Sequence, residues 1–396
     1  MNLYVFLGDL SSDNNVKGSG QMIFVKISDL KNGMRLARPI YAKTGVLLYE
    51  RNSKLTSQAI ESIKSFGLIG MFILEPAEPV PPMTQADMDF ERFQTMNTFS
   101  IKEELEKIKK TGHPSKIQII VSNIIKVYGH LDKKINFVQN LRSKEDYIYK
   151  HALNVSILCT LMASYMNVKV SDQNECVTAA IIHDIGMLLV PQELLDKEDK
   201  DDDDIRTITA ARTKGYDIIE SAFSSHPNVK RICLQTASKA DSRENVKMVD
   251  GAKILAVADT FDSMTAMQLD KPPASEVAAI KYLIENPEKF DKESVDALTR
   301  TINILSPGVS VELNTGDKAL ILAENQENIL KPMLLNFRNN TIMDLSNEID
   351  YGDVSIVDAM KTMDNRCIMD TKTLAKYGVK VDDQDYVDVP GDQQNS

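Results

Sequence analysis

Two histidines and two aspartates interrupt apolar, helix-like stretches of this sequence. His183 and Asp184 lie inside "AAIIHDIGMLLVP", His151 opens "HALNVSILCTLMASYM", and Asp259 lies within "ILAVADTFDSM". Burying an imidazole or a carboxylate is costly unless the group has a partner. Imidazole nitrogens and carboxylate oxygens together suit Fe, Mn, Zn or Mg. The four residues therefore predict a site for one divalent metal, and such a site can activate water for phosphate ester hydrolysis.

The helices expected around the two histidines can bring them to the same height. The segment "NVKVSDQNE" predicts a turn between antiparallel helices, with Ser171 as the helix cap. His151 lies about 15 residues before this turn and His183 about 12 residues after it, or roughly 20 Å along each helix at about 1.5 Å per residue. Gly186 is expected to leave room for an ion near His183 and Asp184.

Other polar residues have competing interpretations. Without a metal, His183 and Asp184 would form a satisfied buried pair. Asp262 shares a helix face with Asp259, so it could orient a ligand or pair with a cation. His226 is predicted to lie in a loop before a helix, and His113 and His130 are predicted at the surface. The acidic run "KEDKDDDDIR" lacks the glycine and terminal glutamate of an EF-hand loop, which favours a solvated loop with Asp204 as a helix cap.

The elements that must position these residues are mainly helical. The periodicity predicts a mainly α protein, with a helical core between a small α/β module and a small β module. The turn signal "NTGD" predicts a hairpin in the β module, and "EPAEPVPPM" predicts an extended connector. The predicted segments are a disordered or appended segment at 1–21, the α/β module at 22–78, a Pro-rich linker at 79–97, the helical domain at 98–305, the β module at 306–346, and an acidic tail at 347–396.

Composition narrows the possible partners. The formal charge is −11 and the pI is near 5.1, which disfavours general binding to nucleic acids or to membrane surfaces because the protein's field repels phosphate. The four cysteines have no CxxC spacing, so neither a disulfide framework nor a zinc–cysteine site is indicated. No apolar run of about 18 residues is present to span a membrane. These features predict a cytoplasmic protein.

The motifs resemble those of the HD superfamily of metal-dependent phosphohydrolases, and specifically the HD-GYP subfamily that hydrolyses cyclic di-GMP. The matching phrases are "EDYIYKHALNV", "AAIIHDIGMLLVPQELL", "KGYDIIE" and "ILAVADTFDSMT", in the family's order across residues 140–305. The resemblance implies an HD-type helical bundle and implies that His151, His183, Asp184 and Asp259 are metal ligands. It also implies that a nucleotide or cyclic dinucleotide is a possible ligand.

The sequence departs from this family at several functional positions. Where the family has further metal-binding histidines, this chain has Ala211, Thr236 and Ala237. The Gly-Tyr-Pro loop is replaced by "SKADSRENVK". Met187 stands where the family has a lysine that contacts substrate phosphate, and a methionine cannot supply that charge. The resemblance therefore implies a degenerate HD-GYP-like protein that keeps the ligand set of the simpler, mononuclear HD enzymes.

Three functional hypotheses follow. In the first, the protein is a regulatory or interaction module in cyclic-dinucleotide signalling, with one metal, weak or no phosphodiesterase activity, and a possible signalling protein partner. In the second, it is an active mononuclear phosphohydrolase acting on a nucleotide or cyclic di-GMP, with Asp184 as the catalytic residue. In the third, it is a scaffold in which His183 and Asp184 only bond to each other and their neighbours.

Overall fold

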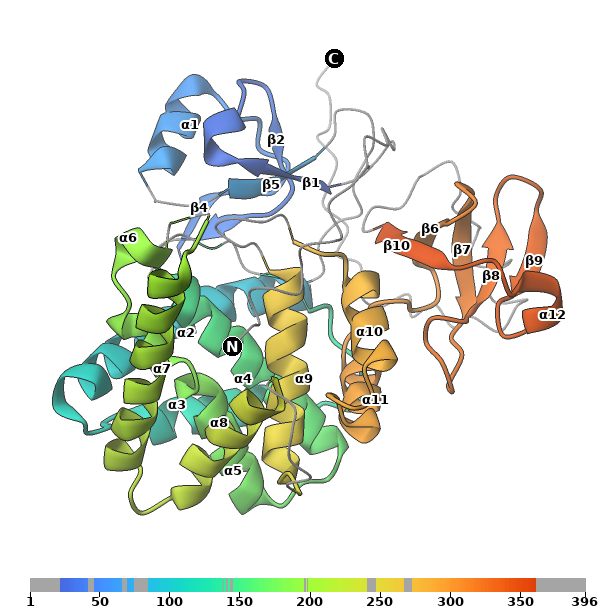
Figure 1. The fold of residues 1–396 in the computed structure, drawn as a ribbon. Coiled ribbons are helices and arrows are strands. Elements are labelled where there is room, and N and C mark those ends of the chain that lie inside the picture. The colour runs from blue at the N-terminus through green and yellow to red at the C-terminus, as the bar shows by residue number, and fades with distance from the viewer. Residues whose placement is uncertain are drawn as a thin grey trace.

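The computed structural model of the chain describes residues 22–41, 46–65, 70–74, 85–137, 139, 142, 145–195, 197, 199–240, 247–266 and 273–360. As expected from the sequence, the fold is mainly α, with a small sheet-containing region at each end of the helical core (Figure 1). Among the described residues, no helix combines the length and the apolar character needed to cross a bilayer. The predicted N-terminal segment 1–21 lies outside the described residues.

The N-terminal module combines two small sheets with one helix. Strands β1 (Met22–Lys26), β5 (Gly70–Leu74) and β2 (Arg35–Leu36) form an antiparallel sheet in that order. The short strands β3 (Ile40–Tyr41) and β4 (Leu47–Tyr49) pair separately, and a 3-10 turn follows β1 at Ile27–Asp29. Helix α1 (Ser57–Lys64) is capped by the Thr56 side chain, which accepts a hydrogen bond from the Ala59 amide.

The helical domain surrounds one long buried helix, α4. Fourteen of the 19 residues of α4 are buried, a pattern typical of a helix enclosed on all sides. Helices α2, α3, α5, α9 and α11 all pack against α4. The helices and short turns of this domain are α2 (Gln85–Thr111), α3 (Ile117–Tyr128), α4 (Tyr147–Tyr165), α5 (Val170–Ile182), η2 (Ile185–Leu189), α6 (Gln192–Leu195), α7 (Asp202–Ala222), α8 (Pro227–Ala240), α9 (Asp250–Thr265), α10 (Glu276–Glu285) and α11 (Lys292–Thr301).

The turn between α4 and α5 differs in detail from the prediction. Asn167 adopts a left-handed conformation with φ of 53°, which stops α4. The residue that caps α5 is Lys169, and it makes no side-chain capping bond, so the prediction of Ser171 as the cap is wrong. The two helices nevertheless pack together as predicted.

The C-terminal module is a five-stranded antiparallel sheet with the strand order β10-β6-β7-β8-β9. Its strands are β6 (Ser310–Leu313), β7 (Lys318–Ala323), β8 (Met333–Asn336), β9 (Thr341–Asp344) and β10 (Ile356–Met360), and α12 (Glu348–Tyr351) precedes β10. The predicted hairpin at "NTGD" joins β6 to β7, and Gly316 supplies its positive φ of 80°.

Two predicted boundaries are wrong. Residues 85–97, assigned to the Pro-rich linker, belong to α2, and the rest of that linker lies outside the described residues. The predicted tail at 347–396 begins too early, because β10 pairs with β6 and completes the C-terminal sheet. The division of the chain into separate domains stays a prediction.

Gly186 does not leave space for an ion, contrary to expectation. A Cβ atom there would lie 2.7 Å from the Ala211 carbonyl oxygen and 2.8 Å from Arg212 Cα, both in α7. Gly215 of α7 faces Gly186, since a Cβ on Gly215 would lie 2.7 Å from Gly186 Cα. These two glycines let α7 approach η2 closely, next to the "HD" pair.

Replacing Gly186 by alanine is expected to lower the free energy of unfolding by about 1–3 kcal/mol, the usual cost of forcing extra atoms into a packed contact. The added methyl would meet backbone atoms, which cannot rotate away. Urea denaturation followed by circular dichroism measures the change. The control is Thr213→Ala at an exposed position of α7, expected to stay within about 0.5 kcal/mol of the wild type. Equal stability of Gly186→Ala and the wild type would contradict the close packing.

Candidate metal centre

His151 is oriented by a hydrogen bond on the side of its ring away from His183. It lies in α4, and its Nδ1 is 2.7 Å from Oδ2 of Asp262 in α9. A carboxylate accepts hydrogen bonds, so Nδ1 carries the proton and donates to Asp262. Nε2 of His151 then points toward His183 and Asp259, at 3.3 Å from His183 Nε2 and 3.1 Å from Asp259 Oδ1.

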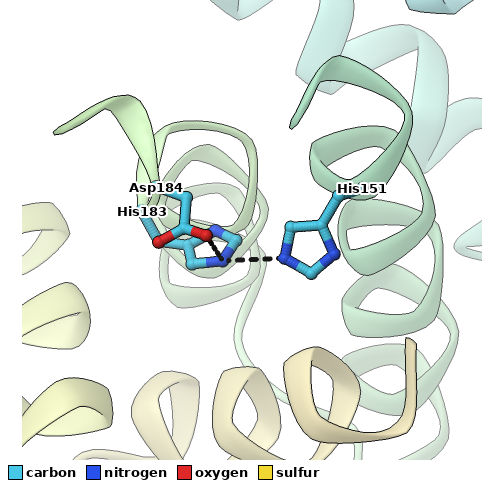
Figure 2. A group of neighbouring side chains, drawn as sticks. All are labelled: His151, His183 and Asp184. Atoms are coloured by element: carbon cyan, nitrogen blue, oxygen red, sulfur yellow. Dashed lines mark hydrogen bonds and ion pairs between the residues drawn. The ribbon is translucent and has the colours of Figure 1, made fainter. Parts of the chain in front are cut away.

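His183 is oriented in the same way by the backbone. It is the residue that ends α5, and its Nδ1 donates to the Ala180 carbonyl oxygen at 2.9 Å. Its Nε2 therefore also points into the space shared with His151 and Asp259. Figure 2 shows the two imidazoles facing each other across the gap between α4 and the end of α5. When each Nδ1 keeps its proton and donates it to its acceptor, both Nε2 atoms offer lone pairs to a single point.

Two carboxylates complete this cluster. Asp184 follows His183 directly, and its Oδ2 lies 4.0 Å from His183 Nε2 (Figure 2). Asp259 Oδ1 lies 3.7 Å from the same nitrogen. Donor atoms of His151, His183 and Asp184 all lie within 4.8 Å of one another, a spacing that could hold a metal ion. The structure thus brings together the four residues that the sequence singled out.

Access to the cluster is from the carboxylate side. The side chains of His151 and His183 are 5% and 7% exposed, whereas those of Asp259 and Asp184 are 21% and 31% exposed. A ligand from solvent would therefore meet Asp184 and Asp259 first, with the imidazoles behind them.

Asp262 does both things that the sequence left open: it orients His151 and it pairs with a cation. Both of its oxygens accept from Arg142, at 2.8 and 2.6 Å. Its Oδ1 also accepts from Asn154 at 2.8 Å and from Gln139 at 3.0 Å. Asp262 and Arg142 are both fully buried, so this ion pair is sealed from water.

The electrostatics of the cluster favour a cation among its atoms. Burial alone would lower the pKa of His151, but hydrogen bonds with Asp259 and Asp262 raise it to about 10. Burial alone would raise the pKa of Asp259, but hydrogen bonds from His151 and His183 hold it well below its usual range. The carboxylates thus stabilise positive charge at this point, and a divalent ion can supply that charge in place of a proton.

The positions at which the resemblance expects further ligands carry no metal-binding side chains. Ala211 has no donor side chain, and its backbone packs against Gly186. Thr236 donates its hydroxyl to backbone carbonyls of Ile232 and Ala252. Met187 is buried in a small apolar cluster with Val190 and Ile208. The segment 241–246, within the replaced Gly-Tyr-Pro loop, lies outside the described residues.

The remaining polar candidates lie away from this cluster or serve a helix end. His226 is exposed in the turn before α8, and His113 and His130 are exposed as well. The acidic run begins α7, where Asp201 is the cap, so the prediction of Asp204 as the cap is wrong. Asp204 instead completes a capping box by accepting from the Asp201 amide.

Comparison with known proteins agrees with this geometry. Residues 136–294 match a family model described as an HD domain, and this span contains all four clustered residues. The chain therefore contains an HD domain over these residues. HD domains typically bind a divalent metal, and the His-His-Asp group described above can hold one.

Two curated relatives of this HD protein are cyclic di-GMP phosphodiesterases. The chain is 23% identical over 231 residues to cyclic di-GMP phosphodiesterase PA4108 of Pseudomonas aeruginosa, covering 56% of this chain and 55% of the relative. It is 22% identical over 311 residues to cyclic di-GMP phosphodiesterase PdeB of Borreliella burgdorferi, covering 68% of this chain and 79% of the relative. The HD protein thus spans only about half the length of the Pseudomonas relative.

The sequence analysis missed the residues that support Asp262. Arg142, Gln139 and Asn154 all bond to its carboxylate, yet none was singled out. Asn154 interrupts the apolar face of α4, a signal that could have identified it. Arg142 and Gln139 precede α4 in a stretch of sequence where no periodic pattern marks a buried residue.

Proposed function

We propose that this HD protein binds one divalent metal through His151, His183, Asp184 and Asp259, and acts as a regulatory or interaction module in cyclic-dinucleotide signalling with weak or no phosphodiesterase activity. The observation that carries the metal site is the convergence of the two Nε2 atoms beside the carboxylate of Asp259. The choice of ligand class rests on the two relatives named as cyclic di-GMP phosphodiesterases.

The proposal of weak or absent turnover rests on the residues beside the cluster. A divalent metal would polarise a phosphate oxygen, while a clamp on both attacking and leaving oxygens requires two metals. The side chains of Ala211 and Met187 provide neither a second set of ligands nor a phosphate-binding charge. In this chain, His151 and His183 would hold the ion from the buried side. Asp184 and Asp259, nearer to solvent, would face the phosphate.

An active mononuclear phosphohydrolase is the second candidate. It is favoured by the presence of all four donors, two imidazoles and two carboxylates, in one cluster. In that case Asp184 is the catalytic residue, because it is the most exposed donor and lies beside His183. The substrate would be a nucleotide or cyclic di-GMP.

Metal analysis combined with cyclic di-GMP binding and hydrolysis assays tests the proposal. Protein purified under reducing, metal-replete conditions is expected to contain about one equivalent of metal, to bind cyclic di-GMP and to hydrolyse it weakly or not at all. Asp184→Asn is expected to lower metal affinity, because an amide donates weakly to a cation. The matched control is Asp172→Asn in the exposed first turn of α5.

Two results would decide between the candidates. Metal-dependent turnover of cyclic di-GMP that disappears in Asp184→Asn and persists in Asp172→Asn would overturn the regulatory proposal and support the mononuclear enzyme. Absence of metal from the wild type, with no binding of cyclic di-GMP, would contradict both and leave the scaffold hypothesis.

A further inference from the structure

A buried arginine of the N-terminal module reaches into the helical domain. Arg38 lies between β2 and β3 and is only 7% exposed. Its guanidinium donates a hydrogen bond to the backbone carbonyl oxygen of Gln139, in the segment before α4. Burial lowers the pKa of Arg38, and three carboxylates of the helical domain, Glu91, Glu276 and Asp87, act in the opposite direction. The contact therefore places a buried guanidinium of the module near acidic side chains of the helical domain.

Gln139 continues from this contact toward the metal centre. Its side-chain amide donates to Asp262 Oδ1 at 3.0 Å and to Thr265 Oγ1 at 2.8 Å, and its Oε1 accepts from Asn154 at 2.9 Å. Gln139 is 5% exposed, and all of these partners are buried. Neighbours in α4 and α9 thus hold the side chain of Gln139, and Arg38 holds its backbone carbonyl.

Asp262 links Gln139 to the imidazole of His151 by hydrogen bonds. It accepts from Gln139 on Oδ1 and from His151 Nδ1 on Oδ2 at 2.7 Å. A continuous series of hydrogen bonds therefore runs from Arg38 through Gln139 and Asp262 to His151, whose Nε2 faces the candidate metal position. This series is called the Arg38 relay below.

We infer that the N-terminal module tunes the metal centre through the Arg38 relay, with Arg38 and Gln139 as positioning residues for His151. The inference rests on the proposed function, because it assigns a regulator to the same metal site. Hydrogen-bonding partners behind a ligating histidine fix its tautomer and ring orientation, and their loss lowers metal affinity about 10–100-fold. Arg38 is two partners further out than Asp262, so an effect near the lower end of that range is expected.

The relay gives the module a specific route of control. When the module is docked, Arg38 donates a hydrogen bond to the Gln139 backbone carbonyl, and Asp262 accepts one from the Gln139 side-chain amide. When the module is displaced, the Gln139 carbonyl loses this hydrogen bond, and Asp262 keeps Arg142 and Asn154 but has a less constrained Gln139. The metal centre then persists with weaker affinity, so the module acts as a modulator of the site and supplies none of its ligands.

Arg38→Ala in the full-length chain tests the relay. We expect the dissociation constant for Mn²⁺, measured by titration, to rise about 10-fold. The matched control is Arg35→Ala: Arg35 is an exposed arginine of the same module that bonds to Asn52 and has no part in the relay. Its dissociation constant is expected to equal that of the wild type. Arg38→Lys, which keeps the charge, is expected to recover part of the affinity.

A spectroscopic readout separates positioning from general destabilisation. The chain has five histidines, so selective ¹⁵N-histidine labelling yields few signals. In metal-free protein, the Nδ1 proton of His151 is expected far downfield because it is bonded to a buried carboxylate. Arg38→Ala should shift or broaden this signal, and Arg35→Ala should leave it unchanged. Gln139→Leu removes the next link and should perturb the same signal, which keeps the test decisive if Arg38→Ala fails to fold.

Three results of these measurements would count against the relay or against the proposed function. An unchanged Mn²⁺ affinity and an unchanged His151 signal in Arg38→Ala would overturn the relay. An affinity loss without a change at His151 would also overturn it, because the module would then act by another route. If the wild type binds no Mn²⁺, the proposed function fails, but the His151 signal in Arg38→Ala and Gln139→Leu still decides whether the relay exists.

Discussion

Asp262→Ala is expected to lower the free energy of unfolding by about 3–5 kcal/mol, the range found when one partner of a buried ion pair is removed. The variant would leave the Arg142 guanidinium buried without its carboxylate, since both side chains are 0% exposed. Donors on Asn154 and Gln139 and the Nδ1 proton of His151 would lose the same acceptor. Urea denaturation at neutral pH, followed by circular dichroism, measures the loss.

A matched control for this variant is the exposed pair formed by Lys64 and Glu61. Their atoms lie 2.7 Å apart, close to the 2.6 Å of Arg142 and Asp262, but the side chains are 46% and 71% exposed. Glu61→Ala is expected to change stability by at most about 1 kcal/mol. If Asp262→Ala cost no more than Glu61→Ala, the buried network would not be structured as described.

Asp262→Asn separates the effect of the carboxylate charge on stability from the effect of the side chain's shape. The amide fits the same space but its nitrogen cannot accept the Arg142 or His151 hydrogen bonds. We therefore expect Asp262→Asn to lose stability as well. A full recovery of stability by the asparagine would mean that packing, and not the carboxylate charge, is what the site requires.

The candidate ligands could be predicted because they break an apolar pattern. His151, His183, Asp184 and Asp259 each lie in a helix-like run of apolar residues, where an unpartnered polar group is costly. The shared height of the two histidines followed from helix geometry alone, and the structure has His151 Nε2 and His183 Nε2 3.3 Å apart. Three of the four motifs that carry the HD resemblance contain these candidate ligands, and the fourth, "KGYDIIE", lies in α7.

The supporting network could not be predicted in the same way. Arg142 lies in "NLRSKED", where charged neighbours indicate an exposed loop, and only the tertiary fold buries it. The contact between Arg38 and Gln139 joins residues that are far apart in the sequence, in elements without a shared pattern. The role assigned to Gly186 was wrong for a related reason, because the approach of α7 is set by packing between distant segments.

The two misplaced boundaries have physical causes. The buried positions of the first half of α2 include Glu91, Gln94 and Thr98 together with Phe90, so polar residues conceal the helical period. Strand β10 follows an acidic stretch and contains Asp358, and its place at the sheet edge is given by pairing with β6. Side-chain pattern alone carries little information at such positions.

His183→Ala is expected to remove detectable metal from the protein while the fold is retained. His183 supplies one of the two Nε2 atoms of the cluster, and its Nδ1 donates to the Ala180 carbonyl oxygen. Losing a direct ligand should cost at least as much affinity as the loss of an outer partner, so we expect a decrease of about 100-fold or more. Elemental analysis and Mn²⁺ titration measure it.

His226→Ala is the matched control for this variant. His226 is exposed in the turn before α8 and bonds to the neighbouring Ser225 hydroxyl, away from the four clustered residues. We expect its metal content to equal that of the wild type. Stability separates the metal hypothesis from the scaffold hypothesis, in which His183 and Asp184 serve only each other. Under the scaffold hypothesis, His183→Ala lowers stability and leaves the metal content unchanged. Under the metal hypothesis, Mn²⁺ stabilises the wild type and does not stabilise His183→Ala, because a ligand stabilises only the state that binds it.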